Sequence, residues 1–168
     1  KIFSWSGDKN HEKDTFMTPY DSIKYHKQIL QTSFTAMDPR TGEVKAWVGG
    51  INYKWFKYDH VTASRQVGST IKPLLYTLAV TDAGYGPDTY IPGGPLTLSG
   101  KTISSKGGSM AYCLANSLNG AAWRLIATVG VKRMVDFGKQ CGITAKLLPY
   151  PSIALGAAEI PMLQMLQA

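Results

Sequence analysis

Two residues three positions apart, Ser69 and Lys72, could together attack a carbonyl group. They lie in the stretch "RQVGSTIKPLLY", which spans residues 65–76. A serine hydroxyl is a weak nucleophile until a base removes its proton. Residues three apart share one face of a helix, so a helix beginning at Ser69 would place Lys72 beside the hydroxyl. The chemistry that this pair could perform is nucleophilic acyl transfer.

The neighbouring residues suit the first turn of such a helix. The partial positive charge of a helix N-terminus, together with burial, would lower the pKa of Lys72 and favour a neutral amine that can act as base. Pro73 is tolerated because first-turn N–H groups have no partner within the helix. Gly68 allows a close backbone approach, and the Ser69 amide could face an oxyanion formed on an attacked carbonyl.

A second short motif supports acyl-transfer chemistry, which the first motif alone does not establish. Taken by itself, the first motif is better explained by Ser69 as a helix cap and Lys72 as an exposed lysine. The stretch "CLANSLN" adds Ser117 and Asn119 at an expected helix break. The Ser117 hydroxyl could relay a proton between Lys72 and a leaving amine, and the Asn119 amide could bind a substrate carbonyl or amide.

Other chemistries are poorly supported by the sequence. His60 is a lone histidine near Ser69, and no Gly-x-Ser-x-Gly elbow is present. The stretch "GGPLTLSGKT" does not have the spacing of a phosphate-binding loop. No cluster of histidine and cysteine has the spacing of metal ligands. We therefore expect no metal and no cofactor.

The elements that must position these residues form a helix-rich α+β pattern. A β-hairpin is expected over 34–50 around the turn "DPRTG", with one face of its second strand buried. Helices are expected from Ser22 to about residue 30, over 69–81, over 109–130 with a break near Asn119, over 131–142 and at the chain end. The stretches 51–68 and 91–102 are interpreted as loops, the second holding at most a short strand.

Composition limits the class of protein. The chain has 168 residues, 44% of them hydrophobic and 17% charged, which suits one domain with its own core. It has no apolar run of about 18 residues that could span a membrane. The net charge is +7, but the 18 lysines and arginines are scattered, so nucleic-acid binding is not expected. Cys113 and Cys141 lie among apolar residues, so buried free thiols are the default expectation and a disulfide between the two is the alternative.

The two motifs in this order resemble the penicillin-binding proteins and serine β-lactamases. The segments "MDPRTGEVKAWVGG", "RQVGSTIKP", "LANSLN" and "PSIALGAAEIPMLQM" are more specifically similar to the transpeptidase domain of a class A (bifunctional) penicillin-binding protein. The resemblance implies an α+β, penicillin-binding-protein/serine β-lactamase-like transpeptidase fold, with helices packed on an antiparallel sheet. It also implies that residues 34–168 belong to this domain and that residues 1–33 form an N-terminal linker or edge segment.

The resemblance assigns a role to each of the four residues. Ser69 is implied to be the acylated nucleophile, Lys72 its base, Ser117 a proton shuttle and Asn119 a substrate-binding amide. The implied partners are peptidoglycan stem peptides and β-lactam antibiotics. A membrane anchor and a glycosyltransferase domain are implied to lie outside this chain, with the domain itself in the periplasm or outside the cell.

The chain departs from the family pattern in three places, one of which is a short region between "TLSGKT" and "CLANSLN". Val67 stands where the family usually has proline. The third family motif, Lys-Thr/Ser-Gly on an inner strand, is not found, and "GKT" at 100–102 has the wrong order and position. We expect the domain to be incomplete at its C-terminus, to expose a sheet edge and to be a poor catalyst alone, because one oxyanion-hole donor is worth roughly 2.7–4 kcal/mol.

Two other functions share the same motifs. One is a β-lactam-binding sensor or inactive scaffold, which acylates once or never. The other is a β-lactamase, which needs a base for a deacylating water, and no residue suggests itself for that role. Turnover of a D-Ala-D-Ala-type thioester would separate the transpeptidase from the sensor, because only the transpeptidase turns over.

Overall fold

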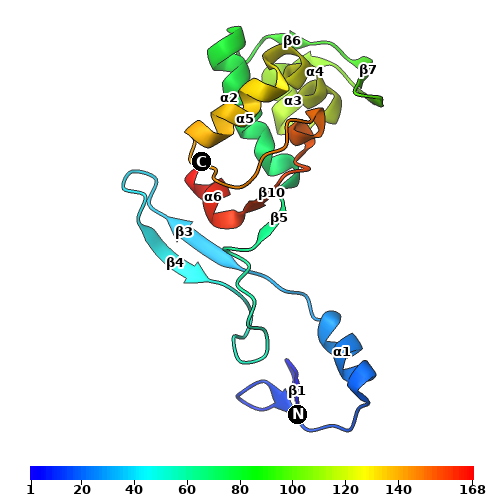
Figure 1. Cartoon of the computed structure of the whole chain (residues 1–168), viewed down its shortest axis with the longest axis vertical. Helices are drawn as coiled ribbons and strands as arrows, with labels where there is room; N and C mark the ends of the chain where they lie inside the picture. Colours follow the sequence, from blue (N-terminus) through cyan, green and yellow to red (C-terminus); the bar gives the residue numbers. More distant parts are fainter.

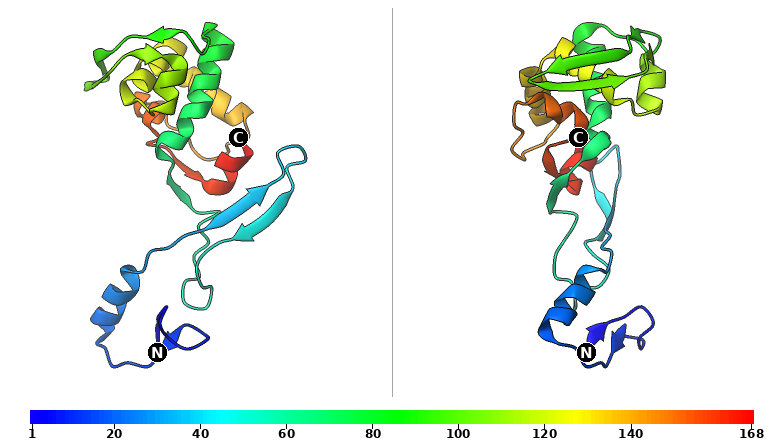
Figure 2. Two further views of the ribbon diagram at one scale, coloured as in Figure 1. Left: turned by 180° about the vertical axis from the view of Figure 1, so that it is seen from behind. Right: turned by 90° about the vertical axis from the view of Figure 1, so that its right-hand side faces the viewer.

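The computed structural model describes residues 1–168 and divides into three parts along its length (Figure 1). An N-terminal unit lies at one end, a helical body at the other, and a β-hairpin lies between them beside the last helix. Two further views show the same separation of the two ends (Figure 2). The elements in chain order are β1 (Ile2–Phe3), β2 (Glu12–Lys13), α1 (Pro19–Lys27), β3 (Phe34–Met37), β4 (Val44–Val48), β5 (Ser64–Gln66), the 3-10 helix η1 (Gly68–Ile71), α2 (Lys72–Ala83), β6 (Tyr90–Ile91), β7 (Gly94–Leu98), β8 (Lys101–Ser105), β9 (Gly108–Ser109), α3 (Met110–Ala115), α4 (Asn119–Val129), α5 (Val131–Gln140), the 3-10 helix η2 (Pro151–Leu155), β10 (Glu159–Pro161) and α6 (Met162–Gln167).

The N-terminal unit contains the first helix, which begins earlier than the sequence indicated. Ser22 was expected to cap it, but Thr18 does so by accepting a hydrogen bond from the Asp21 N–H across 3.1 Å. Pro19 occupies the first turn, where its missing N–H has no cost. The expected cap at Ser22 is therefore wrong, because a threonine followed by proline is an equally good start signal four residues upstream.

Aromatic side chains join this unit to the segment after β4. Phe3 is fully buried and meets the Phe56 ring edge-on at a centroid distance of 5.3 Å. The His26 ring stacks on Trp55 at 5.6 Å. The irregular part of the segment expected as a loop, residues 51–63, thus packs against the N-terminal unit, whereas residues 64–66 form β5 and not a loop.

The hairpin of β3 and β4 confirms the expected turn. The two strands pair antiparallel, with Phe34 opposite Val48. The turn between them contains Asp38, whose carboxylate accepts from the Arg40 N–H, and Gly42 at φ +73°. A non-glycine residue would be strained at this φ, which explains the glycine in "DPRTG".

The expected burial of one face of β4 is wrong. Val44 is 42% exposed and Val48 is 50% exposed. Each of the five sheets has only two strands, so no further strand pairs with this hairpin, and the helix that packs on it, α6, contacts β3. Both outer edges of the hairpin are unpaired, in agreement with the expected exposed sheet edge.

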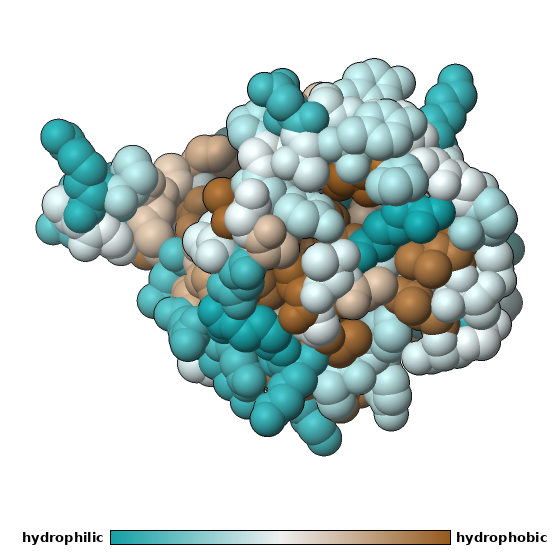
Figure 3. All heavy atoms as spheres, turned by 90° about the horizontal axis from the view of Figure 1, so that it is seen from above, coloured by the Kyte–Doolittle hydropathy of each residue, from teal (hydrophilic) through white to brown (hydrophobic).

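The hydrophobic core lies in the helical body. α2 packs against α4, and α4 also packs against η2, α5, β7 and β8. The largest side chains at its centre include Trp123, which is 1% exposed. An ion pair from Arg133 to Asp82, with Nε 2.5 Å from Oδ2, ties α5 to the end of α2. Viewed from the end opposite the N-terminal unit, the surface of this body shows apolar residues in several places, separated by polar ones (Figure 3).

The segment expected to be a loop over 91–102 instead holds a second hairpin. β7 and β8 pair antiparallel with Leu98 opposite Lys101. Ser99 and Gly100 form the two-residue turn, at φ +47° and +78°. Turns with two positive φ angles match the twist of paired strands, and the Ser-Gly dipeptide is therefore itself a hairpin signal.

The remaining helices largely confirm the sequence predictions. The region 109–130 divides into α3 and α4 at the expected break, and α5 and α6 lie where helices were expected. Cys113 is buried and Cys141 is half-buried, both as free thiols. No helix is both long enough and apolar enough to cross a membrane.

Candidate active site

Ser69 lies on a tight turn between β5 and α2. The expected helix start is a 3-10 helix, η1, which begins at Gly68 with φ +55° and continues directly into α2. Ser69 is exposed, and its hydroxyl makes no hydrogen bond within the chain. Pro73 occupies the first turn of α2, as expected. The candidate nucleophile is thus presented to solvent at the start of a helix.

Lys72 is the only one of the 18 lysines and arginines that is buried, with 1% of its surface exposed. Its Nζ donates to the backbone carbonyl of Ser117 across 2.6 Å, contacts the Ser117 hydroxyl at 3.0 Å and donates to Asn119 Oδ1 across 2.8 Å. All three partners are uncharged. A buried lysine without a carboxylate partner is uncommon, because desolvation of its charge is then uncompensated.

That environment shifts the amine toward its neutral form. Burial lowers the pKa of the Lys72 amine below its ordinary value of 10.5. The same three partners suit a neutral amine, because the Ser117 hydroxyl can donate into the nitrogen lone pair while the two N–H groups donate to the Ser117 carbonyl and Asn119. The site therefore holds a lysine that can accept a proton, already bonded to a hydroxyl that can carry one.

Ser117 lies at the C-terminal end of α3 in a left-handed conformation. Its φ is +50°, one of three positive values at non-glycine residues. The Ser117 N–H donates to the Leu114 carbonyl, and the Leu118 N–H donates to the Cys113 carbonyl, each across 2.9 Å. This is the Schellman pattern, in which the left-handed position is usually glycine. The backbone turn aims both the carbonyl and the hydroxyl of Ser117 at Lys72.

Asn119 is the first residue of α4, on the other side of the same break. Its side-chain oxygen points to Lys72. Gly120 is buried, and a methyl group there would overlap the Ser105 side chain and come within 2.9 Å of the Ser105 nitrogen. β8 therefore packs directly on the first turn of α4 and fixes where Asn119 lies.

The structure thus brings three of the four predicted residues together. Lys72, Ser117 and Asn119 converge although 45 and 47 residues separate the lysine from the other two. Ser69 precedes Lys72 by one turn, and no hydrogen bond joins the Ser69 hydroxyl to the amine. Catalytic hydrogen bonds are often long before substrate binds, so this geometry is compatible with proton transfer from Ser69.

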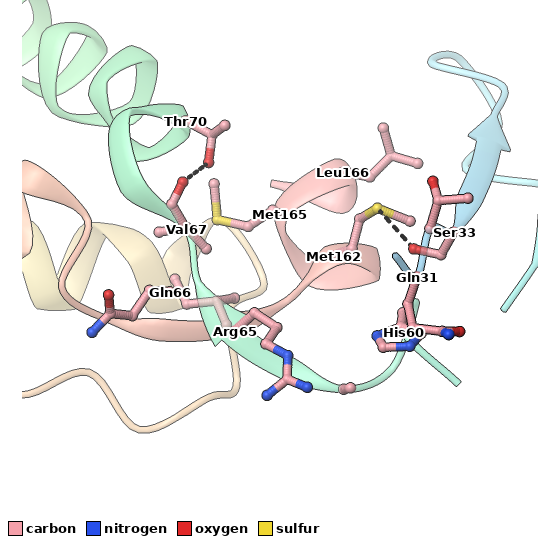
Figure 4. Close-up of a pocket in the computed structure, with 13 residues that line it drawn as sticks. Gln31, Ser33, His60, Arg65, Gln66, Val67, Thr70, Met162, Met165 and Leu166 are labelled. Carbon is pink, nitrogen blue, oxygen red and sulfur yellow. Dashed lines mark hydrogen bonds between the residues drawn. The ribbon is translucent and has the colours of Figure 1, made fainter. Parts of the chain in front are cut away.

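The largest cavity, of about 590 Å³, lies outside the Lys72 cluster, and Figure 4 shows the residues that line it. It is bordered by β5, by α6 and by the residues before β3. Thr70 and Val67, which flank Ser69, line one side, with the Thr70 hydroxyl donating to the Val67 carbonyl across 2.7 Å. None of the four predicted residues lines it. We assign the candidate site from its chemistry, because the cavity holds no comparable set of proton-transfer groups.

Sequence analysis missed the backbone groups that support the Ser69 turn. The carbonyls of Gly156 and Ala158 accept hydrogen bonds from the Gly68 and Val67 N–H groups. The only signal was the segment "PSIALGAAEIPMLQM", which carried the family resemblance without indicating a role. No group of three or more His, Cys, Asp or Glu side chains is arranged to hold a metal ion.

The chain is similar to known proteins over most of its length. Residues 32–148 match the family described as the penicillin binding protein transpeptidase domain, and residues 1–30 match the penicillin-binding protein middle domain. The chain is 36% identical over 153 residues to penicillin-binding protein 2D of Bacillus subtilis, covering 83% of this chain and 22% of that protein. It is 36% identical over 152 residues to penicillin-binding protein 1A of Aquifex aeolicus, covering 83% and 21%.

Solved structures confirm the fold class. Penicillin-binding protein 1A from Haemophilus influenzae superposes with a TM-score of 0.72 at 26% identity, over 80% of this chain and 22% of that one. PonA1 from Mycobacterium tuberculosis superposes with a TM-score of 0.68 at 25% identity, over 79% and 40%. The chain spans about a fifth of the length of these curated relatives. It belongs to the transpeptidase family of penicillin-binding proteins.

Proposed function

We propose that this chain carries the acyl-transfer site of a peptidoglycan D,D-transpeptidase. In this reaction Ser69 forms an acyl-enzyme with a stem peptide, the terminal D-Ala leaves, and an amine of a neighbouring stem peptide takes the acyl group. The observation that carries the proposal is the buried Lys72 amine, bonded to Ser117 and Asn119 and to no carboxylate. Membership of the transpeptidase family supports the same reaction.

Acylation begins with the transfer of the Ser69 hydroxyl proton to the neutral Lys72 amine. The Ser69 oxygen then bonds to the carbonyl carbon of the penultimate D-Ala, and a tetrahedral intermediate forms. A neutral amine is required for this step, because a protonated lysine has no lone pair to accept the proton. The lowered pKa of Lys72 raises the fraction of chain in that form.

Departure of the terminal D-Ala requires a proton on its nitrogen. The Ser117 hydroxyl lies 3.0 Å from the Lys72 amine and can pass that proton on. The carbon–nitrogen bond then breaks, and the acyl group remains as an ester on Ser69. In the second half, the acceptor amine attacks this ester, gives up a proton along the same route, and the Ser69 hydroxyl is regenerated.

Asn119 is proposed to hold the substrate backbone. Its side-chain oxygen accepts a hydrogen bond from Lys72. Its NH₂ group is therefore the part that can donate to a substrate carbonyl. β-Lactams present a reactive carbonyl to the same serine. We propose that they acylate Ser69 and block the site.

The wider setting follows from the proposed reaction. Stem peptides are substrates outside the plasma membrane, so we place this domain in the periplasm or its equivalent, in a membrane-anchored protein. The glycosyltransferase domain and the anchor would lie outside these residues. We propose residues 34–168 as part of the transpeptidase domain and residues 1–33 as the segment that leads into it.

A thioester substrate separates this function from a sensor or scaffold. The chain would be incubated with a D-Ala-D-Ala-type thioester and D-Ala as acceptor amine, and thiol release and amide product would be measured. The transpeptidase gives continued thiol release and an amide product that both disappear in Ser69→Ala. A sensor or scaffold gives at most one equivalent of thiol and no amide product.

A further inference from the structure

The segment after η2 lies directly against the backbone that precedes Ser69. The Gly156 carbonyl accepts from the Gly68 N–H across 3.1 Å, and the Ala158 carbonyl accepts from the Val67 N–H across 3.2 Å. The β5–β10 pairing continues the same ladder, with Gln66 opposite Glu159. Residues 64–68 are therefore hydrogen-bonded to residues 156–161 up to the position next to the candidate nucleophile.

Gly156 and Gly68 make a contact that excludes any side chain at Gly156. A methyl group there would overlap the carbonyl oxygen, the carbonyl carbon and the Cα of Gly68. Gly156 is buried and has φ +74°, and Gly68 has φ +55°. Glycine at position 156 is thus required by packing as well as by its backbone conformation.

This contact matters because it lies on the N-terminal side of Ser69, whose carbonyl already accepts from the Lys72 N–H within the helix but whose hydroxyl has no hydrogen bond. The Lys72 amine is held by three hydrogen bonds, whereas the Ser69 hydroxyl makes none. The direction of the Ser69 Cα–Cβ bond depends on the helix that follows Ser69 and on the peptide plane between Gly68 and Ser69. The hydrogen bond and the close contact between Gly68 and Gly156 restrain that plane.

We propose that Gly156 is a positioning residue for Ser69. It holds the Gly68 backbone in the left-handed conformation from which Ser69 can reach both the substrate carbonyl and the Lys72 amine. Gly156 itself touches neither substrate nor proton-transfer groups. The proposal deepens the proposed function and rests on it for its catalytic consequence.

The chain offers a matched control at Gly84. Gly84 ends α2 at φ +67°, as Gly156 ends η2 at φ +74°. A methyl group on Gly84 would meet nothing within 4 Å. Gly84→Ala and Gly156→Ala therefore impose the same kind of backbone strain, and only Gly156→Ala presses on the Ser69 turn.

The test compares the acylation of both variants by a fluorescent penicillin at a temperature where each is folded. A displacement of about 1 Å at a reacting atom can cost ~10²-fold in rate, so Gly156→Ala should lose about that factor in the first-order acylation constant. The penicillin concentration at half-saturation should stay near the wild-type value, and Gly84→Ala should acylate at the wild-type rate. Equal rates in the two variants would overturn the proposal.

Amide hydrogen exchange keeps the test independent of the chemistry. In Gly156→Ala the amides of residues 67–72 should exchange faster than in Gly84→Ala, and equal exchange would contradict the proposed role. If Gly156→Ala does not fold, the wild type decides: the Gly68 amide should be as protected as the β5 amides. Fast exchange at Gly68 would overturn the proposal. Absence of wild-type acylation would refute the proposed function, while exchange would still report on the Ser69 turn.

Discussion

The Lys72 amine lies 2.6 Å from the backbone carbonyl oxygen of Ser117, a residue in left-handed conformation at φ +50°. This bond connects the first turn of α2 to the break between α3 and α4. It places the Ser117 hydroxyl against the same amine. The left-handed backbone of Ser117 therefore produces the contact through which a proton could pass. A serine in the left-handed conformation is less stable than a glycine would be there. The role of the hydroxyl beside Lys72 explains why the position holds serine.

The first prediction concerns Ser117 itself. Ser117→Ala and Ser117→Gly both remove the hydroxyl, but only glycine relieves the positive φ. We expect Ser117→Gly to exceed Ser117→Ala in free energy of unfolding by about 1 kcal/mol, measured by urea denaturation. Both variants should be acylated more slowly than the wild type. Equal stability of the two variants would show that the left-handed turn is not maintained in solution.

The second prediction concerns removal of the Lys72 amine. Lys72→Met keeps much of the buried volume and removes an amine that has no ionic partner. We expect the free energy of unfolding to change by less than about 1 kcal/mol, because the lost hydrogen bonds are offset by the removed desolvation penalty. The acylation rate should fall by about 10²–10⁴-fold, the usual contribution of a general base. If folded Lys72→Met is acylated at the wild-type rate, Lys72 is not the base.

The third prediction is a pH dependence that belongs to Lys72. Burial lowers the pKa of its amine, so the unfolded chain binds more protons than the folded chain between the folded pKa and 10.5. The amine therefore opposes folding most at pH values below its folded pKa, and this penalty disappears as pH rises toward 10.5. The acylation rate should rise with pH through the folded pKa. Comparison with Lys72→Met isolates both effects, since that variant should show neither.

The fourth prediction tests the support beneath Asn119. Gly120→Ala would force the first turn of α4 away from the Ser105 backbone. We expect this overpacking to lower the free energy of unfolding by about 1–3 kcal/mol. Gly138, inside α5, is the control, because an added methyl would press on the far end of the Leu147 side chain, lie in ordinary contact with the end of Ile143 and meet no backbone of another segment. Gly138→Ala should be neutral or stabilising, since alanine favours helices by about 1 kcal/mol over glycine. Thermal unfolding of both variants distinguishes them.

The fifth prediction separates the two hydrogen bonds beside the Ser69 turn. Val67 has φ −77°, which proline can adopt, and the preceding residue Gln66 is extended as proline requires. Val67→Pro removes the bond to the Ala158 carbonyl and leaves the one from Gly68 to Gly156. We expect stability within about 1 kcal/mol of the wild type. Acylation should be retained, and its loss would show that the Ala158 bond also positions Ser69.

Local signals were sufficient for most helices and for the first hairpin. The turn around Gly42, the break before Asn119 and the helix after Ser69 each depend on residues within a few positions, and each is present in the structure. The β7–β8 hairpin also had a local signal in Ser99 and Gly100, which the Gly/Pro-rich surroundings led us to interpret as a loop. Residue types and spacing therefore predicted much of the helical body.

Features set by distant contacts could not be predicted in this way. β5 consists of Ser64, Arg65 and Gln66, which show no apolar alternation, and it forms only because β10 pairs with it. The contact between Gly156 and Gly68 likewise joins segments far apart in the chain. The exposure of β4 depends on which elements pack on it, and alternation of apolar residues does not specify a partner.

The most direct test of the central claim is covalent labelling of Ser69. The wild type and Ser69→Ala would each be incubated with benzylpenicillin and analysed by intact mass, with peptide mapping of any adduct. The account predicts a single adduct on the wild type, located in the peptide that contains Ser69, and none on Ser69→Ala. An adduct that persists in the variant, or none on folded wild type, would contradict Ser69 as the nucleophile of this chain.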